Sequence, residues 1–285
     1  MSIGTVVQQR FPRIEGIARG WASGWNRIGL QMAFYVRSLA EIRLAIRQYK
    51  GETLRLIAQM SLGTGALAVI GGTVVIIGFL TMSTGAIIAV QGYQQLSGIG
   101  VEALTGFASA FINVRIIAPA VAGIGLSATI GAGATAQLGA MRIAEEIDAL
   151  EVMGVPSVAY LTSTRLVAGV LVGIPLYCIA VICSFLAARV GTTFIYGQST
   201  GVYDHYFNTF LSPTDLIWSF ATVLVVAVIV MLVHTYYGYT ATGGPAGVGE
   251  AVGRAVRTSL IALAFVIMTI SLAVYGQSGN FHLSG

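Results

Sequence analysis

The side chains best suited to chemistry in this sequence are acidic, and they gather in residues 141–156, MRIAEEIDALEVMGVP. This segment holds four of the eleven acidic residues of the chain, namely Glu145, Glu146, Asp148 and Glu151. Long apolar runs flank it, and a segment this polar cannot rest in hydrocarbon. We therefore expect a short amphipathic helix that emerges into water and docks there on a partner through its acids and an apolar stripe, which consists of Ile143, Ile147 and Leu150.

The other reactive side chains form no recognisable catalytic or metal-binding set. The three histidines, His205, His234 and His282, are scattered along the chain. The sequence has no nucleophile elbow, no Walker lysine motif, no zinc-protease motif and no cluster with metal-ligand spacing. We predict no catalytic residue, no metal site and no cofactor bound by this chain. Cys178 and Cys183 would point about 140° apart on a helix, so we expect no disulfide between them.

Two polar side chains, Asn113 and Arg115, lie in apolar surroundings shortly before Pro119. An intramembrane arginine is costly and usually faces a cavity, a carboxylate or the interface. Arg115 either snorkels outward or contacts a lipid headgroup or substrate in a cavity. His234, which precedes a tyrosine pair near the end of another apolar run, is most simply read as part of an aromatic belt.

The composition identifies the environment of these groups. The chain has 285 residues, of which 56% are hydrophobic and only 9% charged, against about 25% charged residues in soluble domains. Several apolar runs exceed the length of about 18 residues that is typical of a spanning helix. We predict an all-α polytopic membrane protein with five transmembrane helices, at residues 63–91, 101–140, 158–189, 214–237 and 258–275.

The basic residues set the predicted orientation. Nine of the fifteen precede residue 56, which favours a cytoplasmic arm facing lipid headgroups over nucleic-acid binding. The apolar run 101–140 is about 60 Å long as a helix, so it is either a helical hairpin or one long span. One span with a cytoplasmic amino terminus leaves only Arg115 and Arg189 away from the inside, so we predict one span, an inner loop at 238–257 and an outer carboxyl terminus.

The amino-terminal arm, residues 1–60, is predicted to be separate from the permease-like domain, residues 61–285. We expect loose order in residues 1–29. Residues 30–60 have the pattern of one basic amphipathic helix, which lies on the membrane surface or packs on a soluble partner.

Small residues recur every four positions along the long second span, as Gly123, Ser127, Gly131, Thr135 and Gly139. Such a row gives a helix a smooth face that another backbone can approach closely. The neighbour is either another helix of this chain or a second subunit.

Residues 137–156, QLGAMRIAEEIDALEVMGVP, resemble the signature of the MlaE/YrbE family, the membrane permeases of ABC-type lipid transporters. VQGY at 90–93, RIIAP at 115–119 and GYTATGGPAGVGEAVGRAV at 238–256 are similar to further family segments in the same order. The resemblance covers roughly residues 55–275 and is closest to the YrbE permeases of mycobacterial Mce systems.

The resemblance implies a permease pair in the plasma membrane, docked on a dimer of ABC ATPase subunits that bind ATP and Mg²⁺, with Mce tunnel proteins outside and a lipid or fatty acid as substrate. It implies a helix that couples to the ATPase, made of Ala144, Glu145, Glu146, Ile147, Asp148, Ala149, Leu150 and Glu151. Our candidates for the substrate path are Gln91, Tyr93, Asn113 and Arg115.

Three positions depart from the family pattern. Ile116 and Gln137 stand where glutamates are expected, and Thr129 stands where an arginine is expected. Because these charges are missing, we predict a non-identical pair in which the partner permease retains them. Two other function classes remain open from the sequence, namely a secondary transporter that works alone and a membrane scaffold of lipid metabolism.

Overall fold

The computed structural model describes residues 12–62 and 72–276, and every regular element within these residues is helical. Five helical stretches in this part of the chain are long and apolar enough to cross a membrane. They are Gly72–Ser97, Glu102–Ile143, Val158–Ile195, Pro213–Tyr239 and Gly244–Tyr275. The prediction of an all-α membrane protein with five spans is confirmed. Residues 63–71 of the predicted first span lie outside the described residues.

The second span is one continuous helical stretch of 42 residues, so the helical hairpin is excluded. It contains α7 (Thr105–Ile112), α8 (Ala118–Leu126) and α9 (Ala132–Ile143). The wider π-helical turns Asn113–Ile117 and Ser127–Gly131 join these helices without breaking the stretch. Such turns insert a residue into the ladder and re-aim the side chains that follow. At about 1.5 Å per residue, the stretch is about twice as long as the hydrocarbon is thick.

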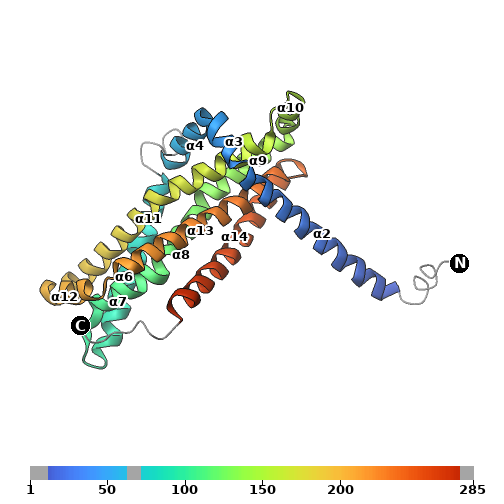
Figure 1. Ribbon diagram of the computed structural model, residues 1–285. Coiled ribbons are helices and arrows are strands. Elements are labelled where there is room, and N and C mark those ends of the chain that lie inside the picture. The colour runs from blue at the N-terminus through green and yellow to red at the C-terminus, as the bar shows by residue number, and fades with distance from the viewer. Residues whose placement is uncertain (1–11, 63–71, 277–285) are drawn as a thin grey trace.

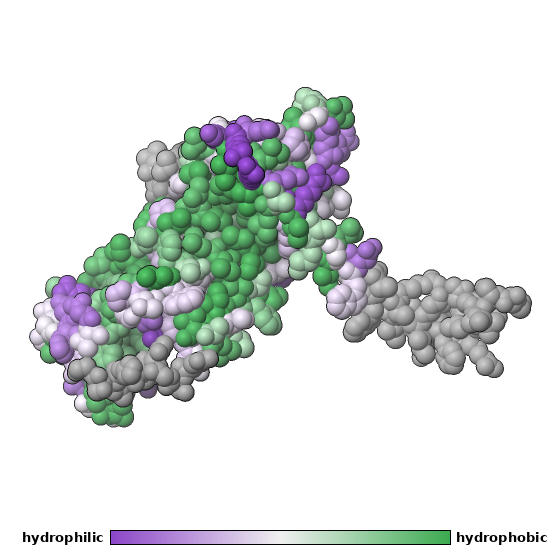
Figure 2. All heavy atoms as spheres, in the orientation of Figure 1, coloured by the Kyte–Doolittle hydropathy of each residue, from purple (hydrophilic) through white to green (hydrophobic). Residues whose placement is uncertain are grey.

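The spans form one bundle with α11 (Thr164–Val190) and α13 (Pro213–Tyr239) at its centre (Figure 1). Helix α6 (Gly72–Ser97) packs on α11, and α14 (Gly244–Tyr275) packs on α13 and α9. Apolar side chains cover the middle of the face shown in Figure 2, whereas hydrophilic side chains gather at its two ends. This distribution suits a bundle whose middle lies in lipid.

The row of small residues on the second span packs within this chain. A Cβ atom at Gly123 would lie 2.4 Å from Leu263 Cδ1, and one at Gly139 would lie 2.8 Å from Val248 Cγ1. Both partners belong to α14. Of the two neighbours considered for this row, the structure therefore shows another helix of the same chain. The missing side chains let α8 and α9 approach α14 closely.

The two ends of the bundle differ in their elements. Helices α3 (Ile42–Gln48), α4 (Lys50–Leu62) and α10 (Glu146–Val152) lie together at one end (Figure 1). Helix α12 (Thr200–Phe210) and the last turns of α14 lie at the other. Helix α2 (Pro12–Ala40) projects sideways from the α10 end, away from the bundle (Figure 1). The chain thus gathers its acidic segment and its basic arm at the same end.

The amino-terminal arm differs from its predicted form. Residues 12–29 are helical where loose order was expected, and the single helix expected over 30–60 is broken at Glu41 and Tyr49 into the end of α2, α3 and α4. The breaks turn the chain so that Leu56 and Met60 enter the main apolar core. One straight helix would carry these side chains away from the bundle.

The stretches between the predicted spans are also largely helical. Helix α6 continues to Ser97, beyond the predicted end of the first span, and α12 fills much of the stretch between the third and fourth predicted spans. Residues 238–257, predicted as an inner loop, are helical from Gly244 on, because α14 begins there. Gly243 and Gly244 have φ values of 90° and 68°, which glycine adopts at little cost, so the turn is completed in a few residues.

Candidate coupling site

Helix α10 follows a sharp reversal of the chain at the end of α9. Glu145 has φ 60° and ψ 13°, and it is the one non-glycine residue with positive φ in the described part of the chain. This left-handed conformation costs an ordinary residue about 1 kcal/mol or more. The reversal turns α10 out of the line of α9 and places it at the extremity of the bundle (Figure 1).

The three side chains of the apolar stripe in the acidic segment differ in how far they are buried. Ile147 is fully buried and packs on Leu138 of α9 and Leu161 of the third span. Burial of such a side chain contributes about 1.5–3 kcal/mol. Leu150 is partly buried in the same cluster, whereas Ile143 is 38% exposed. Ile147 therefore anchors α10 to its own bundle.

The outward surface of α10 combines acids with exposed apolar side chains. Glu145, Glu146 and Asp148 are exposed, and Val152 and Met153 at the end of the helix are 90% and 69% exposed. Ala144 and Ala149 are also exposed. Asp148 forms an ion pair with Arg142, with 2.6 Å between Oδ1 and Nη1. Within residues 12–62 and 72–276, neither Glu145 nor Glu146 forms one. The surface can thus bind a partner that offers cations and an apolar recess.

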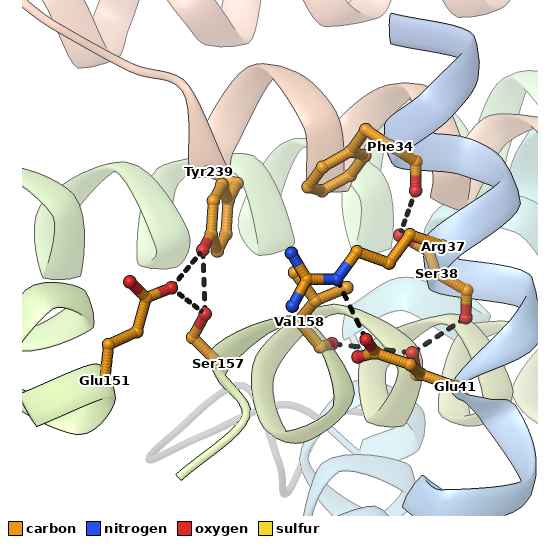
Figure 3. A network of polar contacts seen from close by, with 9 residues as sticks. Phe34, Arg37, Ser38, Glu41, Glu151, Ser157, Val158 and Tyr239 are labelled. Carbon is orange, nitrogen blue, oxygen red and sulfur yellow. Dashed lines mark hydrogen bonds and ion pairs between the residues drawn. The ribbon is translucent and has the colours of Figure 1, made fainter. Parts of the chain in front are cut away.

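Glu151 differs from the other acids because its carboxylate is held by the bundle (Figure 3). Ser157 Oγ donates a hydrogen bond to Glu151 Oε1 at 2.6 Å. The hydroxyl of Tyr239, the last residue of α13, donates to the same oxygen at 3.1 Å. The fourth acid of the predicted coupling set is therefore exposed, yet one of its carboxylate oxygens is bound by its own chain.

A buried polar cluster around His234 joins three helices, and the aromatic-belt position expected for this residue is wrong. His234 is fully buried. Its Nε2 lies 3.1 Å from Ser127 Oγ and 3.2 Å from Ser259 Oγ, and its Nδ1 lies 2.8 Å from Thr135 Oγ1. A serine beside a histidine can serve nucleophilic catalysis. Here the pair has no access for a substrate, so it holds α9, α13 and α14 together.

Arg115 faces a carboxylate at the end of the bundle opposite α10. Its Nη2 and Nε lie 2.8 Å and 3.1 Å from Asp215 Oδ2 at the start of α13. The guanidinium also lies 3.9 Å from the ring centre of Phe111 and 4.2 Å from that of Tyr275. The side chains of the pair are 15% and 14% exposed. Arg115 therefore does not snorkel, and Asp215 is a partner that the sequence did not reveal.

The other predicted path residues contact different neighbours. Tyr93 stacks on Tyr196 with 4.4 Å between ring centres, and Gln91 is exposed. Asn113 is fully buried, and neither polar atom of its amide has a hydrogen-bond partner among the described residues. The structure does not bring the four residues into one cluster. An apolar groove of about 520 Å³ lies instead between α8 and α14, lined in part by Ile116, Ala120, Ile124, Leu263 and Met268.

Comparison with known proteins identifies the family. The family model described as Permease MlaE matches residues 62–273, about three quarters of the chain. The chain belongs to the MlaE permease family. A relative from Rickettsia bellii, named "Probable ABC transporter permease protein", is 27% identical over 237 residues, which cover 80% of this chain and 85% of the relative.

Two further relatives extend the range of organisms. The chloroplastic protein TRIGALACTOSYLDIACYLGLYCEROL 1 of Arabidopsis thaliana is 25% identical over 198 residues, which cover 69% of this chain and 56% of that protein. A "Probable ABC transporter permease protein" of Synechocystis is 24% identical over 196 residues, which cover 69% of this chain and 74% of the relative.

The structure also locates the three positions at which this MlaE family member departs from the expected charges. Ile116 is 51% exposed and lines the groove between α8 and α14. Thr129 donates to the Gly125 carbonyl at 2.7 Å, and Gln137 is exposed on α9. Ile116 and Gln137 are thus accessible on the surface of this chain, whereas Thr129 is partly buried.

Proposed function

We propose that this protein is the membrane-spanning permease subunit of an ABC-type lipid transporter, and that α10 is the helix through which a separate ATPase subunit drives it. Membership of the MlaE permease family supports this, as do the relatives named as probable ABC transporter permeases. The Arabidopsis relative is named for a galactolipid, which supports a lipid as the substrate class.

The observation that carries the proposal is the surface of α10. Glu145, Glu146, Val152 and Met153 are exposed at the extremity of the bundle, while Ile147 fixes the helix from behind. An exposed apolar tip next to uncompensated acids has no role within an isolated chain, because it buries nothing there. It suits a groove on a protein that supplies apolar contacts and basic side chains.

In the proposed mechanism, movement of the ATPase subunits is passed through α10 to the spans. ATP and Mg²⁺ bind to the partner ATPase, and this chain contributes no catalytic residue. When the ATPase subunits close, they displace the outward face of α10. Ile147 transmits that displacement to Leu138 of α9 and Leu161 of the third span, because the three side chains pack together. The α10 end and the amino terminus then face the cytoplasm, and the carboxyl terminus lies outside the plasma membrane.

We further propose that the transporter is an importer of the Mce type that takes up a lipid or fatty acid with the help of Mce tunnel proteins. Its second permease is a non-identical chain that carries the charges replaced here by Ile116, Thr129 and Gln137. Accessible positions for Ile116 and Gln137 support a contact with such a chain. Purification of the complex tests this point, since two copies of this chain and no other permease would contradict it.

Replacement of Glu145, Glu146 and Asp148 together by alanine tests the proposed coupling. The membrane-inserted variant should lose co-purification with the ATPase and lose uptake of lipid, since three exposed acids are gone and the anchor Ile147 remains. Glu250→Ala is the control, because Glu250 is an exposed acid on α14 whose ion pair with Arg254 resembles that of Asp148. Unchanged ATPase binding and uptake in the triple variant would refute the proposal.

A further inference from the structure

The acids of α10 fall into two groups with different surroundings, and Glu151 forms the second group alone. Glu145, Glu146 and Asp148 point outward. Glu151 Oε1 instead accepts hydrogen bonds from Ser157, at the start of the third span, and from Tyr239, at the end of α13. Glu151 is exposed like the other three, so what sets it apart is that one of its carboxylate oxygens is held by two spanning elements.

The number of protons limits which of these hydrogen bonds can form at one time. Ser157 Oγ and Tyr239 OH lie 2.8 Å apart, so the three groups form a closed triangle. Each hydroxyl has one proton, and an ionised carboxylate can only accept. Two protons thus serve three contacts: Ser157 donates to Glu151, and the proton of Tyr239 is shared between Glu151 and Ser157, so the carboxylate is the terminal acceptor of the triangle. Hydrogen bonds to a charged group are stronger than those between neutral groups.

Tyr239 extends the triangle to the amino-terminal arm. Its ring lies 5.3 Å, centre to centre, from the ring of Phe34 on α2 (Figure 3). Ser163 of the third span also donates to the Ser38 carbonyl at 2.8 Å. The same tyrosine packs against the cluster of Leu138, Ile147 and Leu161 beneath α10. One side chain thus contacts α10 by its hydroxyl and α2 by its ring.

We propose that Glu151 is a positioning residue, and that Glu151, Ser157 and Tyr239 form a latch that fixes α10 to α13 and the third span and, through Phe34, to α2. This inference rests on the proposed coupling role of α10. It changes the role of Glu151 from a contact with the ATPase to a joint within the permease. Displacement of α10 then moves the inner ends of two spans and the amino-terminal arm together.

Hydrogen exchange of the full chain in lipid nanodiscs, without any ATPase, tests the latch itself. Tyr239→Phe removes one donor and keeps the ring, so amides of residues 146–153 should exchange about tenfold faster. Ser157→Ala should have a similar effect, and Glu151→Gln, which retains an acceptor oxygen, should have a smaller one. Tyr236→Phe is the matched control, because Tyr236 also packs its ring on Phe34 but does not bond to Glu151. Equal exchange in Tyr239→Phe and Tyr236→Phe would overturn the latch.

The complex with its ATPase tests what the latch does. Tyr239→Phe should retain the ATPase on purification, since the outward acids are unchanged, yet it should move several-fold less lipid per ATP hydrolysed. Loss of ATPase binding as complete as in the triple acid variant would overturn the assignment of Glu151 as an internal joint. If the wild-type chain binds no ATPase at all, the proposed function fails, and the exchange experiment still decides whether the latch exists.

Discussion

Gly131→Ala should destabilise the bundle strongly, because its new methyl group would collide with a side chain that cannot move freely. A Cβ atom at Gly131 would lie 2.6 Å, 2.8 Å and 2.9 Å from His234 Cδ2, Nε2 and Cγ. Ordinary carbon contacts are about 3.5–4.0 Å, so the ring must shift by about 1 Å. That shift breaks at least one of the hydrogen bonds from His234 to Ser127, Thr135 and Ser259, which measure 2.8–3.2 Å.

The expected cost of Gly131→Ala is the sum of two effects. Overpacking costs about 1–3 kcal/mol, and the lost hydrogen bond about 1 kcal/mol. A total of about 2–4 kcal/mol corresponds to a melting temperature roughly 4–16 °C lower for a chain of this size. Thermal unfolding in detergent, followed by tryptophan fluorescence, measures the shift.

Gly133→Ala is the matched control for this measurement. Gly133 lies two residues further along the same span, and a Cβ there meets nothing within 4 Å. The control should melt at or slightly above the wild-type temperature, since alanine favours a helix over glycine by about 1 kcal/mol. If Gly131→Ala and Gly133→Ala melt together, the account of a rigid His234 cluster is refuted.

Three further outcomes follow from the same contacts. Arg115→Met alone should cost about 3–5 kcal/mol by leaving Asp215 unpaired, and adding Asp215→Leu should restore most of the melting temperature; an additive double variant would contradict this. Hydrogen bonds from Arg189 hold the pKa of Asp204 below its ordinary value, so the stabilisation is complete above the ordinary pKa and disappears as the pH falls through the lowered pKa. The melting temperatures of wild type and Asp204→Asn should therefore differ at neutral pH and converge in acid, and a constant gap would count against the pair. Val152→Ser with Met153→Ser should weaken ATPase binding and leave the melting temperature unchanged, because both side chains are exposed; a lower melting temperature would show that they pack within the bundle.

The spans and the position of the acidic helix could be predicted because each depends on local composition. Long apolar runs specify the five spans, and the distribution of arginines distinguishes one long second span from a hairpin. The acids at 145–151 cannot lie in hydrocarbon, which places α10 at an end of the bundle. None of these inferences requires knowledge of which helices touch.

The features that escaped prediction depend on contacts between distant residues. His234 precedes a pair of tyrosines, which is typical of a membrane interface, and its partners Ser127 and Ser259 lie 107 and 25 residues away. The polar members of the small-residue row, Ser127 and Thr135, were the available signal for a buried polar partner. Asp215 and Tyr239 likewise reach Arg115 and Glu151 across 100 and 88 residues.

The helix breaks in the amino-terminal arm also escaped prediction, because they depend on contacts with the rest of the chain. Residues 30–60 contain no proline, and their one glycine, Gly51, lies inside α4, so local propensity gives no reason to end a helix at Glu41 or Tyr49. The breaks follow from burial of Leu56 and Met60 in the main core. Conversely, the glycines among residues 12–29 lowered the expectation of helix, yet α2 continues through them.

Photo-cross-linking from position 152 tests the coupling role of α10 most directly. A photoreactive side chain replaces Val152, which is 90% exposed, and a second variant carries it at exposed Thr209 on α12 at the opposite end. In membranes of the native host, position 152 should give a covalent product with a protein that mass spectrometry identifies as an ATP-binding subunit, and position 209 should not. Cross-linking of that subunit from position 209 alone, or from neither position, would contradict the account.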